Sequence, residues 1–435
     1  MKRETSGVKI LTVAAELSFG GVSASELART YGTPLIVIDT DVLDRNIAAF
    51  VAIGNECGIE VAYAGKALLF VALARRLVRA GLSLDVCSLG ELYTAERAGV
   101  PADRLILHGC GKTDAELGAA VAGRVGRIVI DNREELERLI ERADPSRPVH
   151  ALLRVNSGIE AHTHAYVRTG GEDSKFGFAL DSLGEALARC AASPGLRLLG
   201  LHTHIGSQLY ESDAYEAATH VMLDAISKAR EHGIEIEELV LGGGFGVSAS
   251  PDDEPFDAAA TLRTVSGIVS RSASARGLRT PRLGIEPGRA IVASAGTTLY
   301  RVASVKRQGS RRYAIVDGGM TDNPRPALYD AYHHPDLASR VSAAPLVEAT
   351  ICGRACENDE LVTTALPEDL AAGDLLALHT TGAYTFSMAS NYNRFSRPAV
   401  VFAGGGAHRL VVRRESLEDL VRNDLGPDEP PPSAE

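Results

Sequence analysis

A lysine that follows an apolar run is the residue whose type and position are best suited to chemistry in this sequence of 435 residues. The run Val61–Ala64 predicts a strand, a helical pattern extends from Leu68 to Ala80, and Lys66 lies between them. Because desolvation disfavours the charged form of a lysine, an amine at such a place can become a nucleophile. Nucleophilic amines of this kind form Schiff bases with carbonyl compounds. The alternative is a lysine that extends from a strand end into solvent and has no chemical role.

Eight short apolar runs alternate with helical patterns and would position this lysine. They are rich in Val, Ile and Leu without polar alternation, as is typical of strands buried on both faces. The runs are Ile59–Ala64, Leu82–Cys87, Arg104–His108, Arg127–Asp131, His150–Val155, Arg197–Thr203, Glu237–Leu241 and Leu283–Glu286. The helical patterns that separate most of them are Leu68–Ala80, Gly90–Ala98, Asp114–Ala122, Arg133–Arg142, Ser182–Ala191, Asp213–His232 and Ala258–Arg276. This order predicts an α/β fold with a closed (β/α)8 TIM barrel, and an open doubly wound sheet is the alternative.

Polar, ionisable or glycine-rich residues end each predicted barrel strand. They are Lys66, Asp85, Ser88, His108, Asp131, Asn132, Arg154, Asn156, His202, His204, Gly242–Gly244 and Glu286. In a barrel all these strand ends converge on one face, which is where active sites lie. One or two such residues could be helix caps, but eight strand ends of this kind together predict a functional face.

The sequence pattern changes after the eighth run. Strand-like segments separated by Gly and Pro predict a mostly β C-terminal domain over residues 290–414. The segments are Ile291–Val305, Tyr313–Val316, Val347–Ile351, Leu375–Leu378 and Ala399–Phe402. We expect residues 1–40 to form an N-terminal segment whose strand Leu35–Asp39 joins this β domain, and residues 41–289 to form the barrel. Residues 415–435 are expected to form a C-terminal helix and a disordered, Pro- and acid-rich tail.

Composition and charge argue against several classes of partner and site. A net charge of −11 disfavours nucleic acid and anionic membranes as partners. No apolar stretch approaches the roughly 18 residues of a membrane span, and residues 1–18 lack a signal-peptide pattern, so a cytoplasmic enzyme is expected. None of the six cysteines lies in a CxxC pair, which weakens zinc-ribbon and thioredoxin-like chemistry.

Three motifs at the ends of the later runs could bind a ligand. Gly242–Gly244 would let backbone N–H groups approach a phosphate, although a tight turn explains it equally well. Glu286-Pro287-Gly288-Arg289 could hold a basic nitrogen together with an anionic group. His202-Thr203-His204 could bind zinc, but the eighth strand offers Glu286 beside Pro and Arg, so we expect no metal. A second HxH, at residues 162–164, is interpreted as loop structure.

Ten motifs, in order along residues 34–402, resemble the diaminopimelate decarboxylases, which are alanine-racemase-like (fold-type III) pyridoxal phosphate decarboxylases. The motifs are Tyr63–Ala67, Arg154–Asn156, Ser174–Phe178, His204–Gln208, Gly242–Gly244, Glu286–Arg289, Asp317–Met320, Asn323–Pro326, Cys356–Glu357 and Gly382–Tyr384. The resemblance implies a barrel followed by a β domain, pyridoxal 5'-phosphate as cofactor, and decarboxylation of meso-diaminopimelate to lysine.

The resemblance also implies a role for each matching residue. Lys66 would carry the cofactor, His204 would lie against its ring, and Glu286 would face the ring nitrogen. Further cofactor contacts, chiefly to the phosphate, are implied for Ser207, Gly244, Pro287, Gly288, Arg289 and Tyr384. Substrate contacts are implied for Arg289, Arg325, Tyr329, Glu357 and Tyr384. Cys356 would be the acid that protonates the carbanion. Because the segment around Cys356 reaches a neighbouring barrel in this family, a homodimer with shared sites is implied.

General chemistry agrees with these roles but leaves alternatives open. Arginine binds a distant carboxylate bidentately, and a glutamate suits a distant ammonium, which fits an amino acid with a zwitterionic far end. Taken alone, Cys356 could be a buried structural cysteine, and Arg325 with Glu357 could be a surface ion pair.

The sequence departs from the family pattern in three places, which puts the substrate in doubt more than the reaction. Cys110-Gly111 replaces Asn-Asn, the Cys356–Asp359 segment is one residue shorter, and Tyr332–His334 replaces an Arg-Tyr pair. A decarboxylase acting on another amino acid or on a carrier-tethered one, and a non-catalytic homologue that binds the cofactor, are therefore the other hypotheses.

Overall fold

The computed structural model describes residues 15–159, 174–210, 212–248 and 256–425, and the chain divides into two compact units. The barrel unit comprises residues 42–295 and 382–387. The β unit comprises residues 1–41, 296–381 and 388–435. The barrel segment is therefore inserted between the first strands of the β unit and the rest of that unit.

Eight parallel strands close into a barrel in the order β10-β11-β4-β5-β6-β7-β8-β9. Their bounds are β4 Ile59–Ala64, β5 Ser83–Val86, β6 Leu105–Leu107, β7 Arg127–Ile130, β8 Val149–Arg154, β9 Leu196–His202, β10 Glu238–Val240 and β11 Arg282–Ile285. Side chains from five strands form one buried cluster, made of Ala62, Ile106, Val129, Leu152 and Val240. The closed barrel confirms the predicted TIM barrel and excludes the open sheet.

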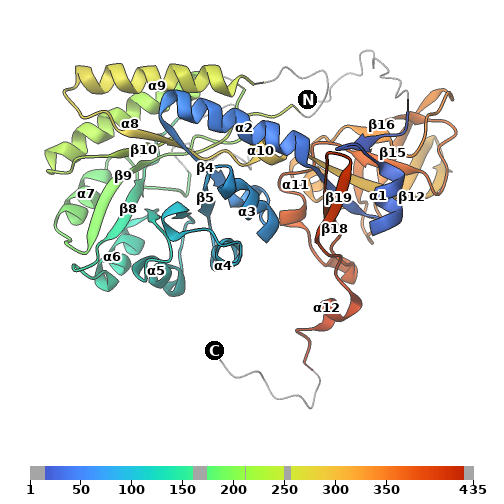
Figure 1. Cartoon of the computed structure of the whole chain (residues 1–435), viewed down its shortest axis with the longest axis horizontal. Helices are drawn as coiled ribbons and strands as arrows, with labels where there is room; N and C mark the ends of the chain where they lie inside the picture. The colour runs from blue at the N-terminus through green and yellow to red at the C-terminus, as the bar shows by residue number, and fades with distance from the viewer. Residues whose placement is uncertain (1–14, 160–173, 211, 249–255, 426–435) are drawn as a thin grey trace. The chain divides into compact units, whose positions relative to one another are not determined.

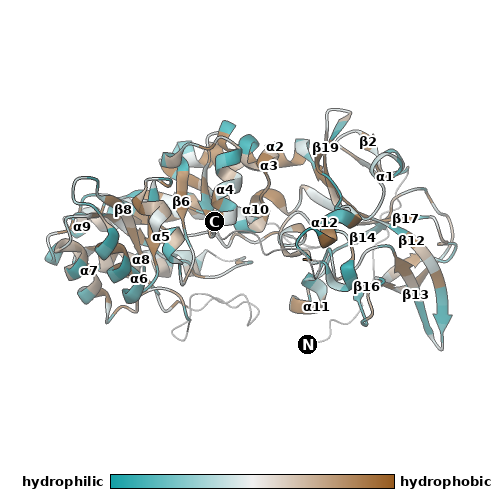
Figure 2. Ribbon diagram, turned by 90° about the horizontal axis from the view of Figure 1, so that it is seen from below, coloured by the Kyte–Doolittle hydropathy of each residue, from teal (hydrophilic) through white to brown (hydrophobic). Residues whose placement is uncertain are grey.

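The helices of the barrel unit lie outside its strands (Figure 1). They are α2 Thr40–Cys57, α3 Val71–Arg79, α4 Leu89–Arg97, α5 Asp114–Val121, α6 Arg133–Arg142, α7 Leu183–Ala191, α8 Asp213–Glu231, α9 Ala258–Ala275 and α10 Arg289–Val292. Each buries one apolar face, as Leu73 and Leu77 of α3 do, and the outward faces are hydrophilic (Figure 2). Ser88 and Asn132 accept hydrogen bonds from backbone N–H groups in the first turns of α4 and α6, so these two strand-end residues are helix caps.

A partly buried ionic network lies at the end of the barrel at which the strands begin. The Arg127 guanidinium donates to Glu60 and to Glu238 Oε2, the latter at 2.8 Å, and Arg282 pairs with Glu238. Ser83 Oγ donates to Glu60 Oε1 at 2.7 Å. These residues line a cavity of about 640 Å³. Because every charged group of the network has an opposite charge beside it, we interpret the network as structural.

Replacement of Arg127 by Met should destabilise the barrel unit strongly. The change leaves Glu60 and Glu238 with only Arg282 to offset two partly desolvated carboxylates, which should cost about 3 kcal/mol of unfolding free energy. Urea denaturation measures this loss. Arg279→Met, on an exposed arginine near the same end, is the matched control and should change stability by less than about 0.5 kcal/mol. Equal stability of the two variants would contradict the structural interpretation.

The β unit is built around a sheet with the strand order β16-β15-β13-β12-β3-β18-β19, with β17 attached to β12 and β14 attached to β17. The bounds are β3 Leu35–Asp39, β12 Gly296–Gln308, β13 Arg311–Val316, β14 Pro335–Leu337, β15 Leu346–Cys352, β16 Glu360–Pro367, β17 Leu375–Leu378, β18 Ala399–Gly404 and β19 Ala407–Val412. The smaller elements are β1 Ser18–Phe19, β2 Val22–Ser23, α1 Ala24–Tyr31, α11 Arg325–Tyr329 and α12 Leu417–Val421. Strand β3 pairs with β12 on one side and β18 on the other, within the sheet of the β unit.

The β unit also contains elements that the sequence patterns missed. The expected strand from Ile291 begins only at Gly296, because residues 289–292 form the short helix α10. Strands β14, β16 and β19 and helix α11 were not predicted. Strand β19 alternates weakly in polarity and is largely exposed, which explains the absence of a clear signal.

Among the helices of the described residues, none combines the length and the apolar character that spanning a bilayer requires.

Candidate active site

Lys66 lies in a single 3-10 turn, η1 (Gly65–Ala67), directly after β4. Its side chain is exposed, and Asp85, Glu286 and Tyr384 influence its charge. Desolvation lowers the pKa of the ammonium, but these neighbours raise it by more, and the net shift is upward. The sequence-based expectation of an amine with a pKa lowered by apolar surroundings is therefore wrong. The amine is instead held charged by acidic neighbours.

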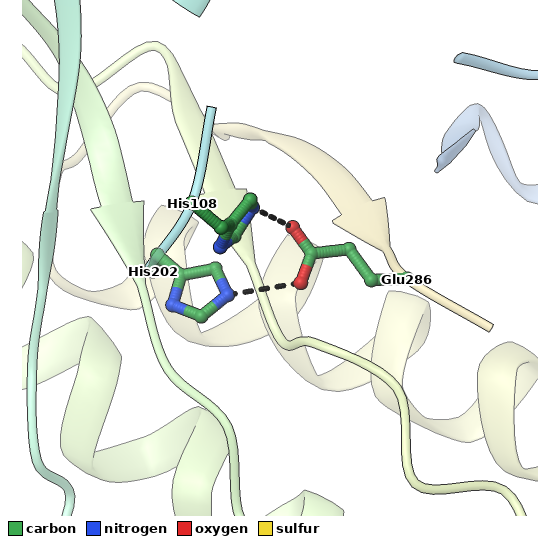
Figure 3. A group of neighbouring side chains, drawn as sticks. All are labelled: His108, His202 and Glu286. Carbon is green, nitrogen blue, oxygen red and sulfur yellow. Dashed lines mark hydrogen bonds and ion pairs between the residues drawn. The ribbon is translucent and has the colours of Figure 1, made fainter. Parts of the chain in front are cut away.

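Glu286 follows β11 and is the centre of a buried polar group at the same end of the barrel (Figure 3). His202, the last residue of β9, places Nε2 3.0 Å from Glu286 Oε2. His108, which follows β6, places Nε2 2.8 Å from Glu286 Oε1 and 3.8 Å from Asp85 Oδ1. Burial raises the pKa of Glu286, but the two imidazoles lower it by more, so the group is a carboxylate.

Among the described residues, His108, His202 and Glu286 are the group whose ligand atoms lie close enough together to hold a metal ion. Two imidazoles and one carboxylate can bind a divalent transition metal. In this structure each Nε2 faces an oxygen of Glu286 rather than a shared point. The two imidazoles therefore lie directly against the carboxylate oxygens.

One oxygen of Glu286 has capacity for a further partner. Glu286 Oε1 is buried and makes no hydrogen bond of acceptable geometry, although His108 Nε2 is close. A carboxylate oxygen can accept two hydrogen bonds. The site therefore offers a buried anionic acceptor to a protonated ring nitrogen.

The turn at Gly242–Gly244 packs against the backbone of two neighbouring strand ends. A Cβ on Gly243 would lie 2.2 Å from the carbonyl oxygen of Glu286, and one on Gly244 would lie 2.4 Å from that of Gly206. Gly244 also has a φ of +100°, which favours glycine. His204 Nδ1 accepts a hydrogen bond from Gly243 N at 3.3 Å. Burial lowers the pKa of His204, so its ring is neutral and can lie against an aromatic ligand.

Arg289, Ser207 and Tyr384 lie together in the barrel unit. Arg289 Nη2 donates to Ser207 Oγ at 3.4 Å, and its guanidinium lies 4.8 Å from the centre of the Tyr384 ring. Tyr384 N donates to Ala67 O at 2.8 Å, which ties this segment to the turn that carries Lys66. A guanidinium, a hydroxyl and a phenol in one place are suited to an anionic group such as a phosphate.

The other residues that the resemblance singled out lie in the β unit. Arg325 is buried in α11, with its guanidinium 4.9 Å from the centre of the Tyr329 ring. Cys356 and Glu357 are exposed, and Tyr392 Oη donates to Glu357 Oε1 at 2.7 Å. An exposed Cys356 excludes the alternative of a buried structural cysteine within this chain.

The shortened segment that carries Cys356 is held by Asp359. This carboxylate accepts hydrogen bonds from Met320 N at 2.6 Å and Ala355 N at 3.0 Å. Asp359 itself has a φ of +44°. The departure from the family pattern therefore still produces a defined turn.

Sequence reasoning omitted three residues from the proposed site that the structure brings next to it. Asp85 and His108 were noted only as strand ends, and His202 only as a strand end and a possible zinc ligand. The signal that could have identified them is their position, since the carboxyl ends of parallel barrel strands share one face. The HxH at residues 162–164 lies outside the described residues.

Comparison with known proteins gives consistent matches. Residues 43–293 match the family model for the pyridoxal-binding domain of pyridoxal-dependent decarboxylases. A diaminopimelate decarboxylase from Actinosynnema pretiosum is 45% identical over 415 residues, covering 94% of this chain and 93% of that protein. One from Bacillus subtilis is 43% identical over 418 residues, covering 94% and 95%. The crystal structure of a diaminopimelate decarboxylase from M. jannaschii with L-lysine has a TM-score of 0.85 at 32% identity, covering 96% of this chain and 98% of that one.

Proposed function

We propose that this chain converts meso-diaminopimelate to L-lysine and CO2. The chain belongs to the diaminopimelate decarboxylase family of pyridoxal-dependent decarboxylases. Membership makes the protein a carboxy-lyase that uses pyridoxal phosphate. The observation that carries the substrate proposal is 45% identity to a diaminopimelate decarboxylase along nearly the full length of both chains. The complex of the M. jannaschii relative with L-lysine, the expected product, supports it further.

The residues of the barrel unit fit the cofactor. The acceptor at Glu286 Oε1 suits a protonated ring nitrogen, and the Arg289–Ser207–Tyr384 group with the glycine turn suits a phosphate. Lys66 is the amine available for covalent attachment of an aldehyde. When bound, the cofactor supplies an electron-accepting ring that makes loss of CO2 from an amino acid possible.

The chain's own residues have distinct tasks in this proposal. Lys66 holds the cofactor and gives way to the substrate amine. Glu286 stays ionised and keeps the proton on the ring nitrogen. Arg289, Arg325, Tyr329, Glu357 and Tyr384 bind and orient the substrate, with arginine on its carboxylates and Glu357 on its distal ammonium. Cys356 delivers a proton from its thiol to the carbon that has lost CO2.

A substrate panel should distinguish diaminopimelate from related amino acids. With cofactor added, the protein should release CO2 from meso-diaminopimelate at a kcat/KM at least about tenfold above that for ornithine, lysine and glutamate. Ornithine and lysine lack the distal carboxylate and glutamate lacks the distal ammonium, so each would leave site groups unpaired, at a cost of about 1.4 kcal/mol or more. Manometry or coupled CO2 detection measures the rates. Turnover of another amino acid alone would favour the altered-substrate hypothesis, and a cofactor-loaded protein with no turnover would favour the non-catalytic homologue.

We further propose that the enzyme acts in the cytoplasm as a homodimer. The family resemblance implies that Cys356 and Glu357 serve the barrel of a neighbouring copy, and their exposure within one chain supports this. Sedimentation at micromolar concentration should give a species of twice the chain mass. A monomer that retains full turnover would contradict the shared site.

A further inference from the structure

We propose that His108 and His202 are positioning residues that hold the Glu286 carboxylate in one orientation for the ring nitrogen of the cofactor. The inference rests on the proposed role of Glu286 and extends it, because neither imidazole itself needs to touch cofactor or substrate. It assigns a task to two buried histidines that the proposed mechanism does not otherwise use.

The geometry of the group carries this proposal. The three residues come from the ends of β6, β9 and β11, so the fold of the barrel brings them together. Each oxygen of Glu286 faces a different imidazole, at 2.8 Å for His108 and 3.0 Å for His202 (Figure 3). The two rings are 5.0 Å apart and inclined by 69°, so they approach the carboxylate from different directions. Rotation of Glu286 about its side-chain bonds would break at least one of these contacts.

The His202 ring is a neutral donor. Its Nδ1 is buried without a hydrogen-bond partner, whereas Nε2 faces Glu286 Oε2. The tautomer with its hydrogen on Nε2 is therefore favoured, because it satisfies the N–H and leaves only a lone pair unpaired. Burial lowers the pKa of His202 to about 4, despite the opposing effect of Glu286, so the ring stays uncharged near neutral pH. It orients the carboxylate without cancelling the charge that the ring nitrogen requires.

The charge of Glu286 depends on these two imidazoles because its other titratable neighbours include both acidic and basic groups. The titratable and charged groups around it, on the elements packed against it, are Lys66, Asp85, Cys87, His108, Arg154, His202 and His204. Burial and the negative charge of Asp85 favour protonation of Glu286, and the imidazoles oppose it. Loss of one imidazole donor should therefore raise the pKa of Glu286. As the pH falls, the carboxylate would then be neutralised sooner and would no longer offset the charge of the protonated ring nitrogen.

The test compares His202→Phe with His202→Gln in the cofactor-loaded enzyme. Phenylalanine keeps the ring volume and removes the donor, whereas glutamine keeps a donor. With phenylalanine, the acidic limb of the kcat profile should move upward by about one pH unit, a roughly tenfold loss of rate on that limb. In cofactor labelled with 15N in its ring, the chemical shift near neutral pH should also show a smaller protonated fraction of the ring nitrogen than in the wild type, because a more basic Glu286 competes for the shared proton. Glutamine should restore most of both properties.

Controls separate positioning from packing and from the proposed reaction. His220→Phe, on an exposed histidine of α8, should leave the pH profile and the 15N shift unchanged. The 15N measurement needs no substrate, so its result stands even if meso-diaminopimelate is not the amino acid consumed. A wild-type pH profile and 15N shift in His202→Phe would overturn the proposal, as would equal effects of Phe and Gln. If phenylalanine at 202 prevents folding, the His108→Phe and His108→Gln pair decides by the same criteria.

Discussion

Lys66→Ala should lose the yellow colour of the cofactor-loaded protein and reduce kcat by at least about 10³-fold. The wild-type protein is expected to absorb near about 420 nm because the cofactor is conjugated with the bound amine. Alanine removes that amine. Reduction with borohydride followed by peptide mass mapping should find the cofactor on the peptide that contains Lys66.

The matched control for this change is Lys306→Ala, on an exposed lysine of β12. It should keep the colour, the labelled peptide and full turnover. A Lys66→Ala protein that retains the absorption band after gel filtration would contradict the assignment of Lys66 as the attachment residue.

Cys356→Ala should keep the colour and lower kcat by about 100-fold or more, because it removes a proton donor and leaves the cofactor site intact. The thiol is exposed within one chain, so the change should have little effect on the stability of the β unit. Cys57→Ala, on a half-buried cysteine of α2, is the control and should retain turnover. Unchanged turnover in Cys356→Ala would remove the acid role.

Mixing the two inactive proteins tests whether the sites are shared. If Cys356 serves the barrel of a second copy, a mixed dimer of Lys66→Ala and Cys356→Ala chains has one site with both residues intact. After subunit exchange the mixture should recover about one quarter of the wild-type activity. If each chain completed its own site, no recovery would occur.

The fold of the barrel unit was predictable because its strands are buried on both faces and its helices are amphipathic. Strand β4 was predicted with its observed bounds, and β9 was displaced by one residue. The β unit was harder, because exposed strands such as β19 lack an apolar pattern, and α10 replaces the start of an expected strand. Residue type alone does not reveal that Arg289–Val292 forms a helix, or that the preceding Gly288 lies close to Ala67.

The site was predictable to the extent that strand ends reveal a shared face. Lys66, Glu286 and the glycine turn were identified from their positions after strands, and the structure brings them to the same end of the barrel. The raised pKa of Lys66 was not predictable, because it depends on the acidic groups that the fold gathers around the amine. The pairing of His108 and His202 with Glu286 joins residues from three strands, and no local pattern encodes it.

The position of β3 in the middle of the β sheet has a consequence for synthesis on the ribosome. Its partners β12 and β18 both follow the whole barrel segment in the chain, so the apolar strand Leu35–Asp39 emerges long before either exists. At 5–20 residues per second this delay before β12 is on the order of 13 to 50 s. During that time the unpaired apolar strand can associate with other nascent chains translated from the same mRNA. Folding in the cell should therefore depend on chaperones that shield the amino-terminal segment.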